Sequence, residues 1–178
     1  MPLLMLKDVP RYECLLKAAE LHPALDPVAH STFMHLLRTA DMVFAETGRF
    51  FSRHNVSQGR FTVLMLLSRS WESPSTPASL AEEAGVTRAT MTGLIDTLEK
   101  DGLVVREPDA HDRRTTHVRI TLNGQEFLGS MLPDHFERVS AMMQTLTKSE
   151  CNQLVQLLQK IQEGLTPPEP TDLASPTT

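Results

Sequence analysis

The chain has 178 residues, 40% of them hydrophobic, with a net charge of −5 at neutral pH. This composition suits one folded domain with a core rather than a disordered chain, and the net acidity excludes a uniformly basic nucleic-acid binder. Positive charge is nevertheless concentrated, because residues 49–119 hold ten Lys and Arg against nine Asp and Glu. No signal peptide or apolar run of spanning length is present, so we expect a cytoplasmic protein.

The N-terminal part predicts three helices. Residues 10–22 fit a helix with Pro10 in its first turn, and we assign 1–29 to an extension that lengthens a dimer interface or covers a pocket. Residues 30–54 then repeat apolar side chains at helical period, at Phe33, Leu36, Leu37, Ala40, Val43, Phe44, Thr47 and Phe51, with a second row at Met34 and Met42. A third helix over 57–69 starts at Ser57 and buries Phe61, Leu64, Met65 and Leu67 or Ser68.

Residues 76–102 predict a pair of helices joined by a tight turn. Thr76 can cap the first helix, with Pro77 in the favoured first position, and Gly85 permits the turn. Thr87 can cap the second helix, whose buried stripe is Met91, Leu94, Ile95 and Leu98. Its other face carries small and basic residues with no acid before Asp96, as a surface that approaches DNA requires. An ordinary helical hairpin with a solvated polar face would show the same two helices.

A hairpin follows the helix pair and favours the DNA-binding interpretation. Leu103 and Val105 alternate with polar neighbours, and so do Val118, Ile120 and Leu122. The loop between these runs carries Asp112, Arg113 and Arg114. Adjacent arginines are not needed to stabilise a hairpin, but they suit a wing that touches phosphates or enters the minor groove. Helix, turn, helix and basic ribbon together predict a winged helix-turn-helix.

The C-terminal part predicts two more apolar helices and a tail. Residues 122–146 gather apolar side chains on one broad side, with Pro133 placed to bend the helix, and a capping box from Thr147 to Glu150 opens the last helix. These helices exceed what a small winged domain needs for its core, so we assign 30–56 and 122–165 to dimerisation. A larger monomeric bundle is the alternative. The Pro-rich segment 166–178 predicts a disordered tail.

The segments LAEEAGVTRATMTGLIDTLEKDGLV and HDRRTTHVRITLNGQEFL resemble the MarR family of winged helix-turn-helix transcription regulators. The resemblance covers roughly residues 30–165. It implies a mainly α fold with a small β-wing, dimerised by its N- and C-terminal helices, with residues 57–121 as the DNA-binding domain. It also implies major-groove contacts from the helix that starts near Thr87 and a minor-groove contact from Arg114. Many members carry an arginine where this chain has Gly93.

The DNA-contact set follows from the helix face and the wing together. It comprises Thr87, Arg88, Ala89, Thr90, Thr92, Asp112, Arg113 and Arg114. A two-fold dimer predicts a near-palindromic double-stranded site with half-sites one helical turn apart. A winged-helix adaptor that binds another protein through the same surface is a competing hypothesis. No phosphate loop, nucleophile elbow or paired carboxylates indicate an enzyme, and no cofactor is expected.

Three sensing mechanisms are open for such a regulator. The family implies an effector crevice between the dimer helices and the DNA-binding lobe, where a small organic, aromatic and anionic ligand would lower DNA affinity. The residues that would line it are His35, Arg38, Met42, Met65, Trp71 and Phe127. A redox switch would need Cys14 or Cys151, and neither lies in HSTFMHLL, where sensing members carry their reactive cysteine. The seven histidines lack compact metal-ligand spacing, so no metal site is predicted.

Overall fold

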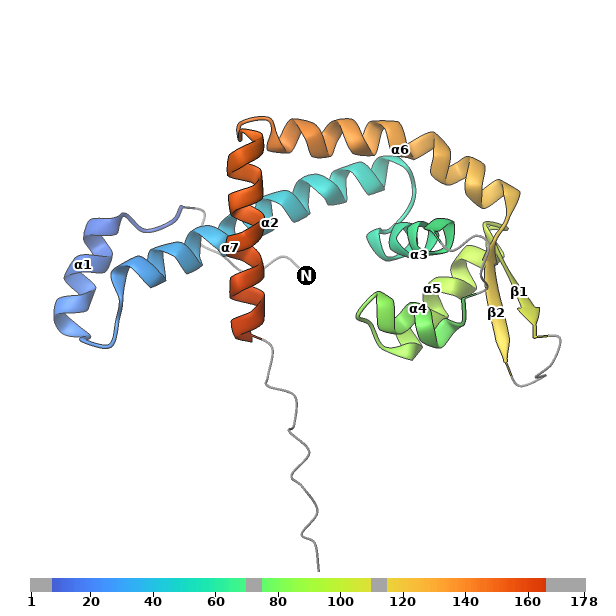
Figure 1. Ribbon diagram of the computed structural model, residues 1–178, viewed down its shortest axis with the longest axis horizontal. Helices are drawn as coiled ribbons and strands as arrows, with labels where there is room; N and C mark the ends of the chain where they lie inside the picture. Colours follow the sequence, from blue (N-terminus) through green and yellow to red (C-terminus); the bar gives the residue numbers. More distant parts are fainter. Residues whose placement is uncertain (1–7, 70–74, 110–114, 166–178) are drawn as a thin grey trace, which may run out of the picture. The chain divides into compact units, whose positions relative to one another are not determined.

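The computed structural model describes residues 8–69, 75–109 and 115–165 (Figure 1). The chain divides after His135 into two compact units, and each is described by itself. Seven helices and one two-stranded sheet are found in the described residues, in the order of helices α1 to α5, strands β1 and β2, and helices α6 and α7. Trp71, Asp112, Arg113, Arg114 and the predicted tail lie outside the described residues.

The extension carries helix α1, Tyr12–Leu21, which contacts α2 and buries Leu15. The prediction that Pro10 lies in its first turn is wrong, because Arg11 is the N-cap and the helix begins one residue later. Since proline is favoured only at the first helical position, Pro10 lies just too early to start the helix.

The long helix α2 spans Pro27–Arg53 and therefore begins three residues before the predicted start at 30. Asp26 is its N-cap, and its Oδ1 accepts hydrogen bonds from the backbone N–H of Val28 at 2.8 Å and of Ala29 at 3.1 Å. The Asp-Pro pair is the local signal for this start, since aspartate caps helices and proline suits the first helical position. Only Phe50 and Phe51 of α2 are buried.

The core of the first unit lies beneath the predicted helix pair. Helix α3, Gln58–Arg69, begins after Ser57 as predicted, and the Ser57 hydroxyl accepts from the Arg60 N–H. Helix α5, Arg88–Lys100, packs against α3, and helix α4, Pro77–Glu83, packs against α5 (Figure 1). The buried residues of this core, which α2, β2 and α6 also supply, include Phe50, Phe61, Leu64, Leu80, Met91, Ile95, Leu98, Val118, Leu128 and Met131. The stripe predicted on α5 is confirmed for Met91, Ile95 and Leu98, and Leu94 is half-buried against the core.

Strands β1, Val104–Pro108, and β2, Thr116–Ile120, form an antiparallel hairpin in the register Val104 to Ile120. The predicted alternation of Leu103 and Val105 with polar neighbours is wrong in phase: Val104 is 2% exposed and Val105 is 38% exposed. Gly102 adopts φ +70°, so the chain reverses after α5 and buries both Leu103 and Val104 before the strand alternation begins. Alternation counted from Leu103 is therefore out of phase by one residue.

Helix α6, Leu122–Met143, continues directly from the hairpin. Leu122 is the first helical residue and is 78% exposed, so its predicted place in a strand is wrong. The physical reason is Thr121, whose hydroxyl accepts from the Gly124 N–H at 3.0 Å and starts the helix there. Pro133 lies inside α6.

Helix α7, Lys148–Leu165, is the main element of the second unit. The predicted capping box is confirmed, because the Glu150 N–H donates to the Thr147 hydroxyl and the Thr147 N–H donates to the Glu150 carboxylate at 2.8 Å. No residue of α7 is buried. Apolar side chains are exposed on α7 and on α2, among them Phe33, Met42, Phe44, Leu154, Leu157 and Ile161.

Candidate nucleic-acid interface

The turn between α4 and α5 sets where the second helix begins. Gly85 adopts φ +63°, a left-handed conformation that glycine reaches without strain, and the Val86 N–H donates to the Ala81 carbonyl. Thr87 then caps α5 as predicted, since its hydroxyl accepts from the Thr90 N–H at 3.1 Å. The start of α5 is thus fixed by local interactions on both sides of the turn.

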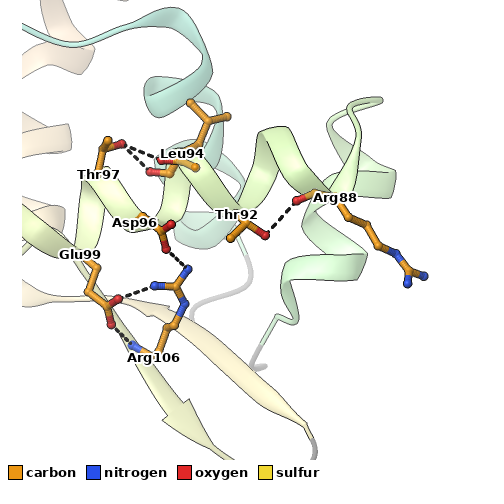
Figure 2. Close-up of polar contacts among 8 residues, drawn as sticks. Arg88, Thr92, Leu94, Asp96, Thr97, Glu99 and Arg106 are labelled. Carbon is orange, nitrogen blue, oxygen red and sulfur yellow. Dashed lines mark hydrogen bonds and ion pairs between the residues drawn. The ribbon is translucent and has the colours of Figure 1, made fainter.

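The outer face of α5 is small, polar and accessible over its first two turns. Arg88, Ala89, Thr90 and Thr92 are exposed, and no acid lies in the first turn. Figure 2 shows the Arg88 side chain extending away from the helix, while the Thr92 hydroxyl donates to the Arg88 carbonyl at 2.9 Å. A Cβ added at Gly93 would meet nothing within 4 Å, so a side chain at this position would extend into open space.

The hairpin is attached to the helices at its base. The Val118 N–H donates to the Ser75 carbonyl at 2.8 Å, which places β2 beside the start of α4. Just after β2, the Thr121 hydroxyl donates to the Gly102 carbonyl at 2.7 Å and the Thr121 N–H donates to the Leu103 carbonyl at 3.1 Å. These bonds connect the end of α5, the hairpin and the start of α6. The wing residues Asp112, Arg113 and Arg114 lie beyond what is described.

Arg106 joins the hairpin to α5, an arrangement that the sequence did not predict. Its guanidinium pairs with Asp96 at 2.5 Å and with Glu99, and its backbone N–H donates to Glu99 Oε1 at 3.1 Å (Figure 2). Partial burial alone would lower the pKa of Arg106, but the hydrogen bonds and charges of Asp96 and Glu99 outweigh it and raise the pKa. No sequence pattern marks this pairing, because it depends on which face of β1 covers α5.

Three further ion pairs connect α3 to the end of α5 and the two sides of the hairpin to each other. Arg60 of α3 pairs with Asp101, the C-cap of α5, and the Arg60 side chain is only 18% exposed. Within the hairpin, Arg119 pairs with Glu107 at 2.9 Å and the His117 ring pairs with Asp109 at 2.8 Å. These contacts involve residues far apart in sequence or on opposite strands, so periodicity alone could not identify them.

Five of the six predicted effector residues lie on three helices, and Trp71 lies outside the described residues. His35 and Met42 of α2 are exposed, and Arg38 of α2 pairs with Asp41 at 3.6 Å. Met65 of α3 and Phe127 of α6 pack, half-buried, against the core. No described contact brings these side chains together. A pocket of about 310 Å³ instead opens behind α5, lined by Phe44, Gln58, Gly59, Thr62, Val63, Ala84, Val86, Met91 and Leu94.

Neither cysteine forms a disulfide; Cys14 is exposed and Cys151 is half-buried. Within residues 8–69, 75–109 and 115–165, no group of three or more His, Cys, Asp or Glu side chains is placed to hold a metal ion. In the same ranges, no helix is long and apolar enough to cross a membrane.

A helix pair with an exposed second helix and an attached hairpin defines a winged helix-turn-helix, the architecture of a class of DNA-binding proteins. Residues 56–116 match the sequence profile of the MarR family. The chain is 31% identical to the HTH-type transcriptional repressor YetL of Bacillus subtilis over 160 residues, which cover 90% of this chain and 96% of YetL. The chain therefore belongs to the MarR family.

Solved structures agree on the fold. The structure of the S. aureus MepR–DNA complex matches with a TM-score of 0.67 at 17% identity and covers 75% of this chain and 95% of MepR. CouR from Rhodococcus jostii RHA1, bound to p-coumaroyl-CoA, matches with a TM-score of 0.64 at 22% identity and covers 80% of this chain and 95% of CouR. MarR-family proteins are transcription regulators and not enzymes, so this chain is a DNA-binding transcription regulator.

Proposed function

We propose that the chain is a homodimeric repressor that binds a near-palindromic DNA site. A small organic ligand releases this repressor from the DNA. One observation carries the DNA-reading part: the exposed face of α5 presents Arg88, Ala89, Thr90 and Thr92 without an acid in its first two turns. Small side chains let the helix approach base edges closely in the major groove, and Arg88 suits a guanine or a phosphate. Thr87 completes the α5 set, and Asp112, Arg113 and Arg114 are the proposed wing contacts.

The dimer part of the proposal rests on apolar side chains that one copy leaves exposed. Phe33 and Met42 of α2 are 53% and 56% exposed, and Leu157 of α7 is 53% exposed. Because α7 buries none of its residues within one chain, a second copy is the occupant that would cover these faces. Residues 30–56 and 122–165 are thus proposed for dimerisation and 57–121 for DNA binding. The symmetric dimer would read two half-sites about one helical turn apart.

In the ligand-binding part of the proposal, the ligand shifts the population between two conformations of the dimer. A ligand that binds better when the two DNA-reading helices are wrongly spaced lowers DNA affinity by its difference in binding free energy between the two states. Two relatives support a repressor that a ligand releases from DNA: YetL is a transcriptional repressor, and CouR was solved with p-coumaroyl-CoA bound. We propose a site at His35, Arg38, Met42, Met65, Trp71 and Phe127, where an aromatic anion would compete with Asp41 for Arg38. A cytoplasmic location follows from this role.

DNA binding is tested by salt titration of duplex affinity for wild type and for Arg88→Ala and Arg114→Ala. Each variant is expected to weaken binding and to lower the slope of log affinity against log salt, by about 0.9 for each phosphate that the variant no longer neutralises. Lys17→Ala on α1 removes the same charge far outside the helix pair in sequence and is the control. Wild type without salt-dependent binding would refute the DNA-reading proposal.

The ligand site is tested through Trp71, the chain's only tryptophan. Substituted benzoates are titrated while tryptophan fluorescence and DNA affinity are followed together. Arg38→Ala is expected to abolish both responses, whereas Thr62→Leu, which fills the pocket behind α5, is expected to leave them intact. The reverse pattern would move the site to that pocket.

A further inference from the structure

An acid lies on the same side of α5 as the proposed DNA-reading residues. Asp96 follows Arg88 by eight residues and Thr92 by four, so at 3.6 residues per turn the three side chains project from one side of the helix. Figure 2 shows them in succession along α5. The Asp96 side chain is 58% exposed. A free carboxylate in this row would repel DNA phosphates when the helix enters the groove.

Arg106 is placed to neutralise this acid and its neighbour Glu99. Strand alternation puts Arg106 on the same face of β1 as the buried Val104, and that face covers α5. The two terminal nitrogens of the guanidinium bind different carboxylates, Nη2 to Asp96 Oδ1 at 2.5 Å and Nη1 to Glu99. The planar fork of arginine suits such divided pairing better than the point charge of lysine.

We propose that Arg106 is a positioning residue for DNA recognition, which masks Asp96 and Glu99 and ties the first wing strand to α5. This inference rests on the proposed DNA-binding function. Arg106 then acts on DNA through the two acids rather than through a phosphate. Its side chain is only 25% exposed, and a direct phosphate contact would first have to break both ion pairs.

The test compares the cost of removing the charge of Arg106 in two backgrounds. Arg106→Met keeps the apolar stem and the backbone N–H, which still donates a hydrogen bond to the Glu99 carboxylate. In the wild-type background, two unmasked acids close to the phosphates are expected to weaken DNA binding roughly tenfold at low salt. In the Asp96→Asn, Glu99→Gln background, the same substitution is expected to cost less than about threefold, because no carboxylate remains to be masked.

Arg119→Ala is the matched control. It removes one positive charge from the partner strand, but Arg119 pairs with Glu107 and not with α5. Its cost is therefore expected to be the same in both backgrounds. If the cost of Arg119→Ala falls in parallel with that of Arg106→Met, the effect is a general change in charge and the proposal is overturned.

The remaining outcomes also distinguish the proposal from its alternatives. An Arg106→Met cost that is equal in both backgrounds means direct phosphate contact, and unchanged DNA affinity means a purely structural role; either result overturns masking. Tighter or unchanged binding by Asp96→Asn, Glu99→Gln supports it, and weaker binding overturns it. If wild type does not bind DNA, the proposed function itself fails. Should Arg106→Met not fold, Arg106→Lys is compared in the same two backgrounds. Its loss of DNA affinity is expected to be smaller in the Asp96→Asn, Glu99→Gln background than in the wild type.

Discussion

The junction between the hairpin and α6 gives the most direct test of the packing. Gly124 is buried at the start of α6, and a Cβ built there would lie 2.1 Å from the Leu103 carbonyl oxygen and 2.7 Å from Ile120 Cγ1. Ordinary carbon–oxygen contacts are about 3.3 Å or longer, so Gly124→Ala requires a shift of roughly 1 Å in backbone rather than in a flexible side chain. The same backbone accepts hydrogen bonds from Thr121.

The magnitude follows from these contacts. Overpacking a filled site costs about 1–3 kcal/mol, and each of the Thr121 hydrogen bonds weakened by the shift costs about 1 kcal/mol. The better helix propensity of alanine offsets about 1 kcal/mol of this destabilisation. We therefore expect Gly124→Ala to lower the free energy of unfolding by about 2–4 kcal/mol.

Gly129→Ala in the same helix is the matched control. Nothing lies within 4 Å of a Cβ at Gly129, and the residue is exposed. Alanine there is expected to raise the free energy of unfolding by about 0.5–1 kcal/mol. Urea denaturation followed by far-UV circular dichroism, at one protein concentration, measures both variants. If Gly124→Ala matches the wild type or exceeds it in stability, the described packing of α6 against the hairpin is wrong.

Three other predictions concern the caps and ion pairs. Thr87→Ala is expected to cost about 1 kcal/mol in urea denaturation through loss of the α5 cap, with Thr87→Ser restoring it; equal stability of the two variants would contradict the cap. Asp101→Asn is expected to destabilise more than Asp101→Asn combined with Arg60→Met, because the single change leaves the half-buried guanidinium without its carboxylate. The pKa of Glu150 is expected below its ordinary 4.5, since the Thr147 N–H and hydroxyl donate to it. The stability it lends α7 is thus complete above the unfolded-state pKa and is lost as pH falls through the folded-state pKa. A carbon-13 NMR titration with a midpoint at or above 4.5 would contradict this.

Local chemistry explains which elements the sequence could predict. Thr76, Thr87 and Thr147 each cap a helix through bonds that span three residues, so their starts can be found without tertiary information. The buried stripe of α5 is equally local, because its period alone determines which side faces the core. The helix pair and its accessible face were therefore predictable.

Interactions between elements explain what the sequence could not predict. The pairing of Arg106 with Asp96 and Glu99 depends on which face of β1 covers α5, and that phase is shifted by one residue by the reversal at Gly102. The apolar row of α2 predicted a dimerisation helix with a larger monomeric bundle as the alternative, and Phe33 and Phe44 are 53% and 51% exposed within one copy. Periodicity locates an apolar face but does not say whether the same chain or a second copy covers it.

Selection of bound sites from a random pool of duplex DNA tests the central claim most directly, namely that α5 and the wing read DNA as part of a two-fold dimer. We expect enriched sites with two inverted half-sites whose centres lie about one helical turn, or about 10 base pairs, apart. The same selection with Arg88→Ala is expected to lose sequence preference within each half-site while keeping their spacing. A single asymmetric site, or no enrichment from the wild-type protein, would contradict the claim.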